Sequence, residues 1–283
     1  MGKRSIIAAA SLLLAVLTVL IAGMMHQNEV LRVSDKSIIT FNDMMRDLKM
    51  VNIVFIGEVH SIPEHHRMEL EVIRAFHESD RPMAIGLEMF RKDSQKDLDS
   101  WVGGGSSLAR FLPVYYDNWH QPWPRYRDIL LYAREHRIPL IGLNIPDAIS
   151  ETVARHGFDS LSADQKKHLP PGISCDVDPA YREFIRKAYE VHPQKPGKKF
   201  LNFCEAQMVW DKAMAWRLVE FVKEDPGRTV VVLAGVGHAW KRGIPEQVAR
   251  QSPFTSRVII PLIPDEIDMD SVTTQDGDYM MLR

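Results

Sequence analysis

Residues 51–60 of this chain read VNIVFIGEVH, and residues 229–238 read TVVVLAGVGH. In each stretch, an apolar run typical of a strand buried on both faces leads into a Gly-x-x-His sequence. The glycine predicts a turn directly after the strand, so that His60 and His238 are each presented at a strand end. Two such turns from distant parts of the chain predict an α/β fold with a polar site at one edge of its sheet.

Other apolar runs predict the rest of the sheet. Together with the first two, the expected strands cover residues 51–56, 83–87, 139–143, 229–234 and 257–263. The expected helices cover residues 63–79 and 124–136, a short segment starting at 162, and residues 179–191 and 200–222. This alternation predicts βαβ units, and therefore the α/β class with a mainly parallel β-sheet flanked by helices.

The expected organisation has one main domain. The α/β domain covers residues 36–264, and residues 265–283 are expected to form an acidic C-terminal tail. Because no strand is expected over residues 147–224, this part predicts a helical insertion or a small helical subdomain that covers the site.

The overall charge excludes one class of partner. The 283 residues carry a formal net charge of -2, and the basic residues are scattered along the chain. Nucleic-acid binding requires a basic patch or stripe, so no nucleic-acid partner is expected.

The N-terminus, residues 1–30, is expected to be a membrane anchor or a signal segment. Lys3 and Arg4 precede residues 6–25, which contain no charged side chain and are long enough to cross a bilayer. The positive flank should stay in the cytoplasm, which places the following domain on the periplasmic side of the inner membrane. The alternative is a signal peptide that is removed, with secretion to the periplasm, although residues 21–23 are a poor cleavage site. A buried core helix is a third interpretation.

The chain has two cysteines, Cys175 and Cys204. In an oxidising compartment they are able to form one disulfide that closes a long loop. The alternative is two separate thiols, and the sequence leaves this choice open.

Polar side chains follow the predicted strands at the ends where parallel sheets bind ligands. They are Glu58, His60, Glu88, Asn144 and His238. Taken singly, such a glutamate often caps a helix and such a histidine is often a structural hydrogen-bonding group. Together, Glu58, His60, Glu88 and His238 predict either catalytic groups of a hydrolase or ligands of a divalent metal ion.

Residues 60–66 read HSIPEHH, which is close to the H-x-x-E-H pattern of some zinc proteases. The spacing is one residue too long, and Pro63 is expected to open a helix. His60 therefore lies in the turn, and His65 and His66 lie at the start of the helix. One of these two is expected to point back at the site, and the other to be solvated.

Two further groups are candidates for binding a cofactor. The segment 101–126 contains Tyr115, Tyr116 and Tyr126 and three of the six tryptophans. It predicts either the walls of a site for a flat apolar ligand, with a phenolate able to bind ferric haem, or a small core within a long loop. On the long helix, Gln207, Asp211 and Met214 share a face that either closes over the site or leaves Asp211 exposed.

These motifs, taken in order, resemble those of the ChaN family, the iron-regulated haem-binding group of the Tiki and erythromycin-esterase-like superfamily. The resemblance covers about residues 36–263 and rests on a set of short stretches. These are Gly57-Glu58-Val59-His60 with His65-His66, Gly86-Leu87-Glu88-Met89-Phe90, Gly142-Leu143-Asn144-Ile145-Pro146, Gln207 to Asp211, and Gly235-Val236-Gly237-His238.

The resemblance implies haem binding in haem or iron uptake, with two stacked haems enclosed by a homodimer and each iron held by a tyrosine. The implied ligand here is Tyr115, Tyr116 or Tyr126. The other branches of the superfamily imply hydrolysis with a divalent metal ion or a general base at the Glu and His residues. Characterised ChaN-like proteins resemble lipoproteins, whereas this chain has no cysteine for lipid attachment after its apolar segment. The expected partners are haem and the inner membrane.

Overall fold

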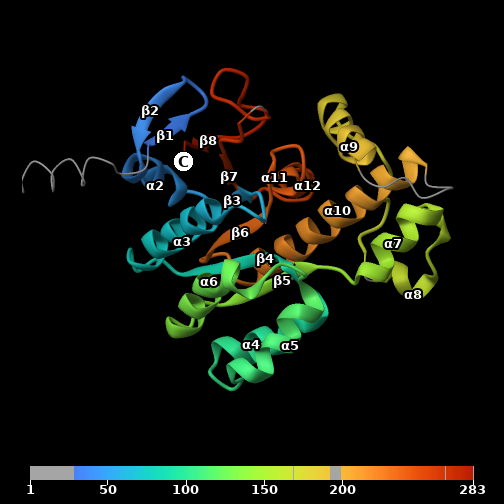
Figure 1. The fold of residues 1–283 in the computed structure, drawn as a ribbon, viewed down its shortest axis with the longest axis horizontal. Coiled ribbons are helices and arrows are strands. Elements are labelled where there is room, and N and C mark those ends of the chain that lie inside the picture. The colour runs from blue at the N-terminus through green and yellow to red at the C-terminus, as the bar shows by residue number, and fades with distance from the viewer. Residues whose placement is uncertain (1–28, 168, 192–198, 265, 283) are drawn as a thin grey trace, which may run out of the picture.

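The computed structural model describes residues 29–167, 169–191, 199–264 and 266–282. Within these residues, an eight-stranded sheet has the order β2-β1-β8-β7-β3-β6-β4-β5 (Figure 1). The strands are β1 (Glu29–Arg32), β2 (Ser37–Thr40), β3 (Ile53–Glu58), β4 (Met83–Arg91), β5 (Leu140–Asn144), β6 (Thr229–Gly235), β7 (Ser256–Pro261) and β8 (Tyr279–Met281). All pairs from β8 to β5 are parallel, and only the β1 pairs are antiparallel. The predicted α/β class with a mainly parallel sheet is confirmed.

Helices cover both faces of the sheet, as the continuous apolar strands require. The helices are α2 (Phe41–Leu48), α3 (Pro63–His77), α4 (Gln95–Val102), α5 (Leu108–Asn118), α6 (Trp123–Glu135), α7 (Asp147–His156), α8 (Ala163–Lys166), α9 (Pro179–Val191), α10 (Phe200–Glu224), α11 (Val236–Ala239) and α12 (Ile244–Gln251). Alternate residues of β3 point to opposite faces: Val54 and Ile56 join the core with α2, α3, α4 and α6, and Ile53 and Phe55 join the core with α10 and α12.

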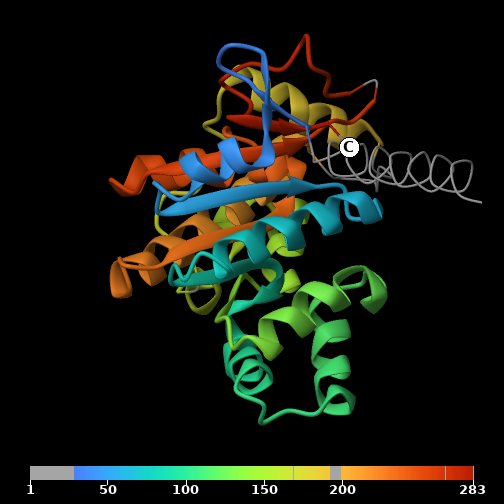
Figure 2. The ribbon, with the colours of Figure 1, turned by 90° about the vertical axis from the view of Figure 1, so that its left-hand side faces the viewer.

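Two helical segments interrupt the alternation of strands and helices (Figure 1). The first, α4 to α6, lies between β4 and β5, and Figure 2 shows α4 and α5 at the bottom of the molecule. The second, α7 to α10, is the helical insertion expected over residues 147–224; it lies between β5 and β6 and has a core of its own. Its last helix, α10, also covers the sheet with Leu218 and Val222, so the second segment is continuous with the main domain.

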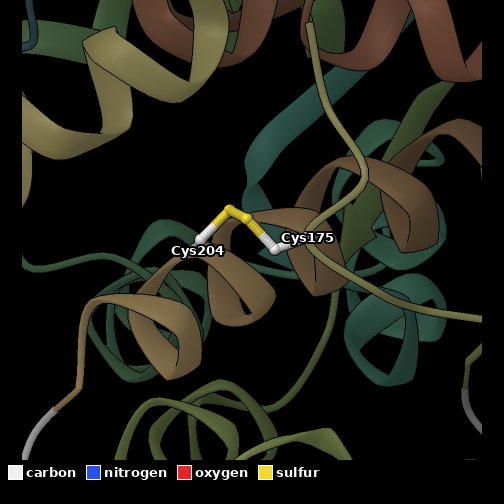
Figure 3. Close-up of a disulfide and its surroundings, with 2 residues drawn as sticks. All are labelled: Cys175 and Cys204. Carbon is white, nitrogen blue, oxygen red and sulfur yellow. A yellow bond between two sulfur atoms is a disulfide. The ribbon is translucent and has the colours of Figure 1, made fainter. Parts of the chain in front are cut away.

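A disulfide joins Cys175 to Cys204, with a Cα–Cα distance of 5.5 Å (Figure 3). Cys204 is buried in α10, and Cys175 lies in the loop before α9. The alternative of two separate thiols is therefore wrong. The bridge ties the start of α9 to the helix that carries part of the site.

The last residues of the chain belong to the sheet. The prediction of an acidic tail over residues 265–283 is therefore wrong for residues 279–281, which form β8. Strand β8 lies between β7 and β1 in the sheet, and Met280 is fully buried. The Asp278 carboxylate accepts a hydrogen bond from Val258 N at 2.8 Å, which connects this segment to β7. The apolar run of β8 is only three residues long, too short for a periodic pattern to be recognised.

No helix in the described ranges is long and apolar enough to cross a membrane. The predicted anchor, residues 6–25, lies outside these ranges.

Candidate functional site

The polar side chains predicted at the strand ends meet at one edge of the sheet. Glu58 ends β3 and pairs in register with Gly235, which ends β6. Glu88 lies near the end of β4, the strand on the other side of β6. These positions create two polar clusters, one around Glu58 and one around Glu88.

In the first cluster, one carboxylate oxygen of Glu58 contacts both His60 and Tyr126. His60 Nδ1 lies 2.7 Å from Glu58 Oε1, and the Tyr126 hydroxyl donates to the same oxygen at 2.6 Å. The other oxygen, Oε2, lies 2.7 Å from His66 Nδ1 but outside hydrogen-bonding geometry. Burial raises the pKa of Glu58, but the contacts with His60 and His66 outweigh it and hold this pKa at about 2. Glu58 is thus a buried carboxylate anion.

His66 and Glu69 extend this cluster along α3. His66 Nδ1 also approaches Glu69 Oε2 at 3.2 Å, and both side chains are buried. Burial lowers the pKa of His66, but the neighbouring carboxylates raise it to about 10. Burial and the charge of Glu58 raise the pKa of Glu69 to about 8. The cluster therefore shares its protons among several groups.

His65 has a structural position. Its Nδ1 accepts a hydrogen bond from Val59 N at 2.9 Å, and burial lowers its pKa. Since both His65 and His66 are buried, the prediction that one of them is solvated is wrong. Pro63 begins α3 as predicted, but the backbone of the preceding turn contacts both rings, with Val59 N at His65 and the His60 carbonyl at His66.

The second cluster is a chain of four side chains. Glu88 Oε1 lies 3.8 Å from His238 Nε2, and His238 Nδ1 lies 2.7 Å from Asp211 Oδ1. The Tyr181 hydroxyl donates to Asp211 Oδ2 at 2.5 Å. Burial lowers the pKa of His238, but Glu88 and Asp211 raise it to about 9. Asp211 is fully buried, so the alternative in which it is an exposed helix residue is wrong.

The clusters approach each other at Gly235. Its backbone N–H donates to Glu88 Oε2 at 2.6 Å. A side-chain carbon on Gly235 would lie 3.3 Å from His60 Nε2 and 3.6 Å from Glu88 Oε2. The glycine is therefore required for the close approach of His60 and Glu88 over the end of β6, as well as for the turn.

Both imidazoles of the Gly-x-x-His turns are arranged alike. Each has Nδ1 beside a buried carboxylate, Glu58 for His60 and Asp211 for His238. His238 Nε2 also lies 3.8 Å from Glu88 Oε1. The side chains of His60 and His238 are 32% and 16% exposed, respectively. A carboxylate on Nδ1 fixes the orientation of the ring and raises its basicity, so the arrangement suits a general base or a metal ligand.

The three candidate tyrosines lie in different environments. Tyr115 is buried, and its hydroxyl donates to the Gln121 carbonyl at 2.9 Å. Tyr126 is buried in the Glu58 cluster. Tyr116 is 47% exposed, and its oxygen accepts a hydrogen bond from Trp123 N at 3.2 Å. Of these three tyrosines, only Tyr116 is exposed.

Most of the aromatic segment forms the core of the first helical insertion, which was one of the two predicted alternatives. Trp101 stacks on Phe111 with ring centroids 4.2 Å apart, and Trp123 packs edge-on against Tyr115 at 5.2 Å. Trp119 differs, because its ring lies edge-on to His60 at 4.9 Å. The insertion thus lines the site through Trp119 and Tyr126.

Of the remaining predicted residues, Asn144 supports the second cluster. Asn144 Nδ2 donates to the Glu88 carbonyl at 2.8 Å and so fixes the backbone that carries this carboxylate. Gln207 is half-buried on α10, one turn before Asp211. Met214 is buried in the apolar core between α10 and the sheet.

Two site residues were not predicted. Glu69 lies three residues after His66 on α3, and this i, i+3 spacing was an available signal for a shared helix face. Tyr181 on α9 has no such signal, because its acceptor Asp211 lies 30 residues further along the chain.

Comparison with known proteins relates this geometry to a family. The model of the family described as "Haem-binding uptake, Tiki superfamily, ChaN" matches residues 44–248. Protein RETICULATA-RELATED 5, chloroplastic, from Arabidopsis thaliana is 26% identical over 238 residues, which are 77% of this chain and 32% of that protein. The chain therefore spans about a third of the length of this relative.

Two solved structures share the fold. ChaN of Campylobacter jejuni, described with cofacial haem binding, superposes with a TM-score of 0.72 at 19% identity, covering 91% of this chain and 97% of that chain. An erythromycin esterase mutant, EreC in its open conformation, gives a TM-score of 0.51 at 14% identity, covering 83% of this chain and 76% of that chain.

Proposed function

Because the chain belongs to the haem-binding uptake family of the Tiki superfamily that includes ChaN, we propose that it binds haem outside the cytoplasm and serves in haem or iron handling. The family predicted from the sequence motifs is confirmed, and haem binding is a property at the level of this family. We place the haem-binding surface on α5, around Tyr116, and the protein outside the cytoplasm.

The exposed residue Tyr116 carries the proposal. Leu108, Leu112 and Tyr116 follow each other at intervals of four residues on α5, and the first and last are exposed. A flat, largely apolar ligand fits such a surface, and a tyrosine oxygen is an accepted ligand of ferric haem. Tyr116 is therefore the proposed iron ligand, while Tyr115 and Tyr126 keep their buried hydrogen bonds.

The disulfide supports an extracytoplasmic location. Disulfides such as Cys175–Cys204 persist mainly in oxidising compartments, including the bacterial periplasm. This agrees with the expected orientation of the N-terminal segment, with its basic residues in the cytoplasm. By analogy with the cofacial haems described for the Campylobacter protein, two copies of this chain would bring their Tyr116 surfaces together around a haem pair.

The test is a haem titration of the purified protein, followed by visible absorption. We expect a shifted haem band in the wild type and a loss of at least about tenfold in affinity in Tyr116→Phe, equivalent to about 1.4 kcal/mol. Tyr132→Phe on α6 is the matched control, because Tyr132 packs against His77 and Arg74 on another surface. Unchanged affinity in Tyr116→Phe would refute this ligand assignment, and no shift in the wild type would refute haem binding.

We also propose a second function, hydrolysis, because His60 and His238 are each oriented by a buried carboxylate beside Glu88. In this proposal His60 accepts a proton from an attacking water molecule, and Glu58 stabilises the imidazolium that results. The related fold of an erythromycin esterase is compatible with this chemistry.

Hydrolysis is tested with ester and lactone probes. General-base catalysis typically contributes about 10²–10⁴-fold, so His60→Gln should lower the rate by at least about 100-fold. His77→Gln changes a histidine in the last turn of α3 and should leave the rate unchanged. A wild-type rate no higher than that of His60→Gln would eliminate this function without affecting the haem proposal, which depends on Tyr116.

A further inference from the structure

A buried group of three possible metal ligands lies beneath His60. Glu58 comes from the end of β3, and His66 and Glu69 come from adjacent turns of α3. Each offers one ligand atom, and these atoms all lie within 4.8 Å of one another. This set shares only Glu58 with the four metal ligands predicted from the sequence, and neither haem binding nor hydrolysis requires it.

The orientation of the His66 ring leaves a position for a proton or a cation between His66 and two carboxylates. His66 Nε2 lies 3.2 Å from the His60 carbonyl oxygen, which only accepts hydrogen bonds, so Nε2 carries a hydrogen. Nδ1 faces Glu58 Oε2 at 2.7 Å and Glu69 Oε2 at 3.2 Å. Without a metal ion a proton on Nδ1 serves these contacts, and a cation would take the place of that proton.

Two carboxylate oxygens of the cluster also lack hydrogen bonds. Within the described part of the chain, Glu69 Oε1 and Glu58 Oε2 are buried atoms without a hydrogen-bond partner. Leaving such an oxygen unpaired away from water is costly. A proton on Glu69 Oε1 does not remove this cost, because the resulting hydroxyl would still lack an acceptor.

We propose that Glu58, His66 and Glu69 bind a divalent first-row transition-metal cation. Metal–ligand bonds of about 2.0–2.2 Å place neighbouring ligand atoms about 3–3.5 Å apart. The His66–Glu69 distance of 3.2 Å already fits, and the His66–Glu58 contact of 2.7 Å needs to open by only a few tenths of an ångström. One imidazole with two carboxylates suits Mn²⁺, Fe²⁺ or Zn²⁺.

Charge and connectivity agree with this assignment. A divalent cation neutralises the two buried carboxylates and allows His66 to bind as a neutral ligand through Nδ1. The His66 Nε2–H then keeps its hydrogen bond to the His60 carbonyl, the kind of outer contact that orients metal-binding histidines. Partly exposed His60 contacts the opposite oxygen of Glu58, so the cation would lie one side chain away from the strand-end site.

The proposal is tested by metal analysis of the purified full-length protein. We expect about one equivalent of Mn, Fe or Zn per chain, with iron counted only after subtraction of haem iron. Glu69→Gln preserves the shape of the side chain and should lower metal affinity more than about tenfold. Glu64→Gln is the matched control, since Glu64 is an exposed glutamate in the first turn of the same helix.

Thermal unfolding gives a second readout. After chelation, adding Mn²⁺, Fe²⁺ or Zn²⁺ at about 100 times its dissociation constant should raise the Tm of the wild type and Glu64→Gln by about 5–10 °C, but not that of Glu69→Gln. If Glu69→Gln does not fold, ¹⁴N coupling from one imidazole in the spin-echo spectrum of the Mn²⁺-loaded wild type decides the question.

Three results would overturn the proposal. The first is a wild type that contains no stoichiometric metal and shows no metal-induced shift in Tm. The second is a folded Glu69→Gln variant with the metal content and metal affinity of the wild type. The third is a Mn²⁺-loaded wild type without nitrogen coupling.

Discussion

Replacing Asp211 by asparagine should reduce stability in a way that depends on pH. Asp211 is fully buried and lies 2.7 Å from His238 Nδ1, so the change removes a charge but keeps the shape of the side chain. The pKa of His238 is about 9 in the folded protein, against an ordinary value of 6.5. In the variant this pKa should fall towards its ordinary value, because only Glu88 is left to favour the imidazolium.

The size of the effect follows from proton linkage. A pKa raised from 6.5 to about 9 corresponds to about 3 kcal/mol of stability. This stability is fully present below pH 6.5 and is lost as the pH rises through 9, because the folded protein then no longer binds the extra proton. Glu88 supplies part of it, so Asp211→Asn should cost about 1.5–3 kcal/mol at pH 6 and clearly less at pH 9.5.

The assay is the free energy of unfolding in urea at pH 6, 7.5 and 9.5, with the disulfide kept oxidised. Contributions from His60, His66 and Glu69 are common to both proteins and cancel in the difference. Glu220→Gln on α10 is the control, since its partly exposed contact with Lys92 should be worth no more than about 1 kcal/mol. If Asp211→Asn costs the same at pH 6 and pH 9.5, His238 is not an imidazolium paired with Asp211, and the reasoning is refuted.

Three other changes test separate parts of the structure. Tyr181→Phe should cost about 1–3 kcal/mol in urea unfolding, because it leaves a buried carboxylate oxygen without its donor. Replacing Cys175 and Cys204 by serine opens a loop of 29 residues and should cost about 3–4 kcal/mol, with the variant, unlike the wild type, insensitive to reductant. Gly142→Ala should cost more than about 2 kcal/mol in the same assay, because the added carbon would lie 2.4 Å from the Arg91 carbonyl oxygen; wild-type stability would contradict the β4–β5 packing.

The central strands could be predicted from the sequence because they are buried on both faces. A run such as 230–234 has apolar residues at every position, which suits a strand covered by helices on both sides. Strands β1, β2 and β8 have only three or four residues each, and such short runs carry no reliable period. The edge of the sheet was therefore missed, although its centre was predicted correctly.

Helices α4 and α5 of the first insertion were missed for a different reason, although α6 was predicted. Its turns contain Gly103 to Gly105 and several prolines, and Pro113 lies inside α5. These residues are typical of loops, but the stacking of Trp101 on Phe111 stabilises the helices around them. The aromatic residues were correctly recognised as a group, but their packing into a core depends on tertiary contacts.

The two Gly-x-x-His turns differ in how their imidazoles are oriented. The carboxylate partner of His60 is Glu58, two residues earlier in the same turn, so the sequence motif itself contains the pair. The partner of His238 is Asp211 on α10, 27 residues earlier, and Asp211 is in turn held by Tyr181 on α9. Changes in the second helical insertion therefore act on His238 and leave the Glu58–His60 pair intact. Since the proposed iron ligand Tyr116 is not among the residues that contact Glu58, His60 or His238, we expect single substitutions to disrupt the proposed haem surface, the His60 pair and the His238 chain separately.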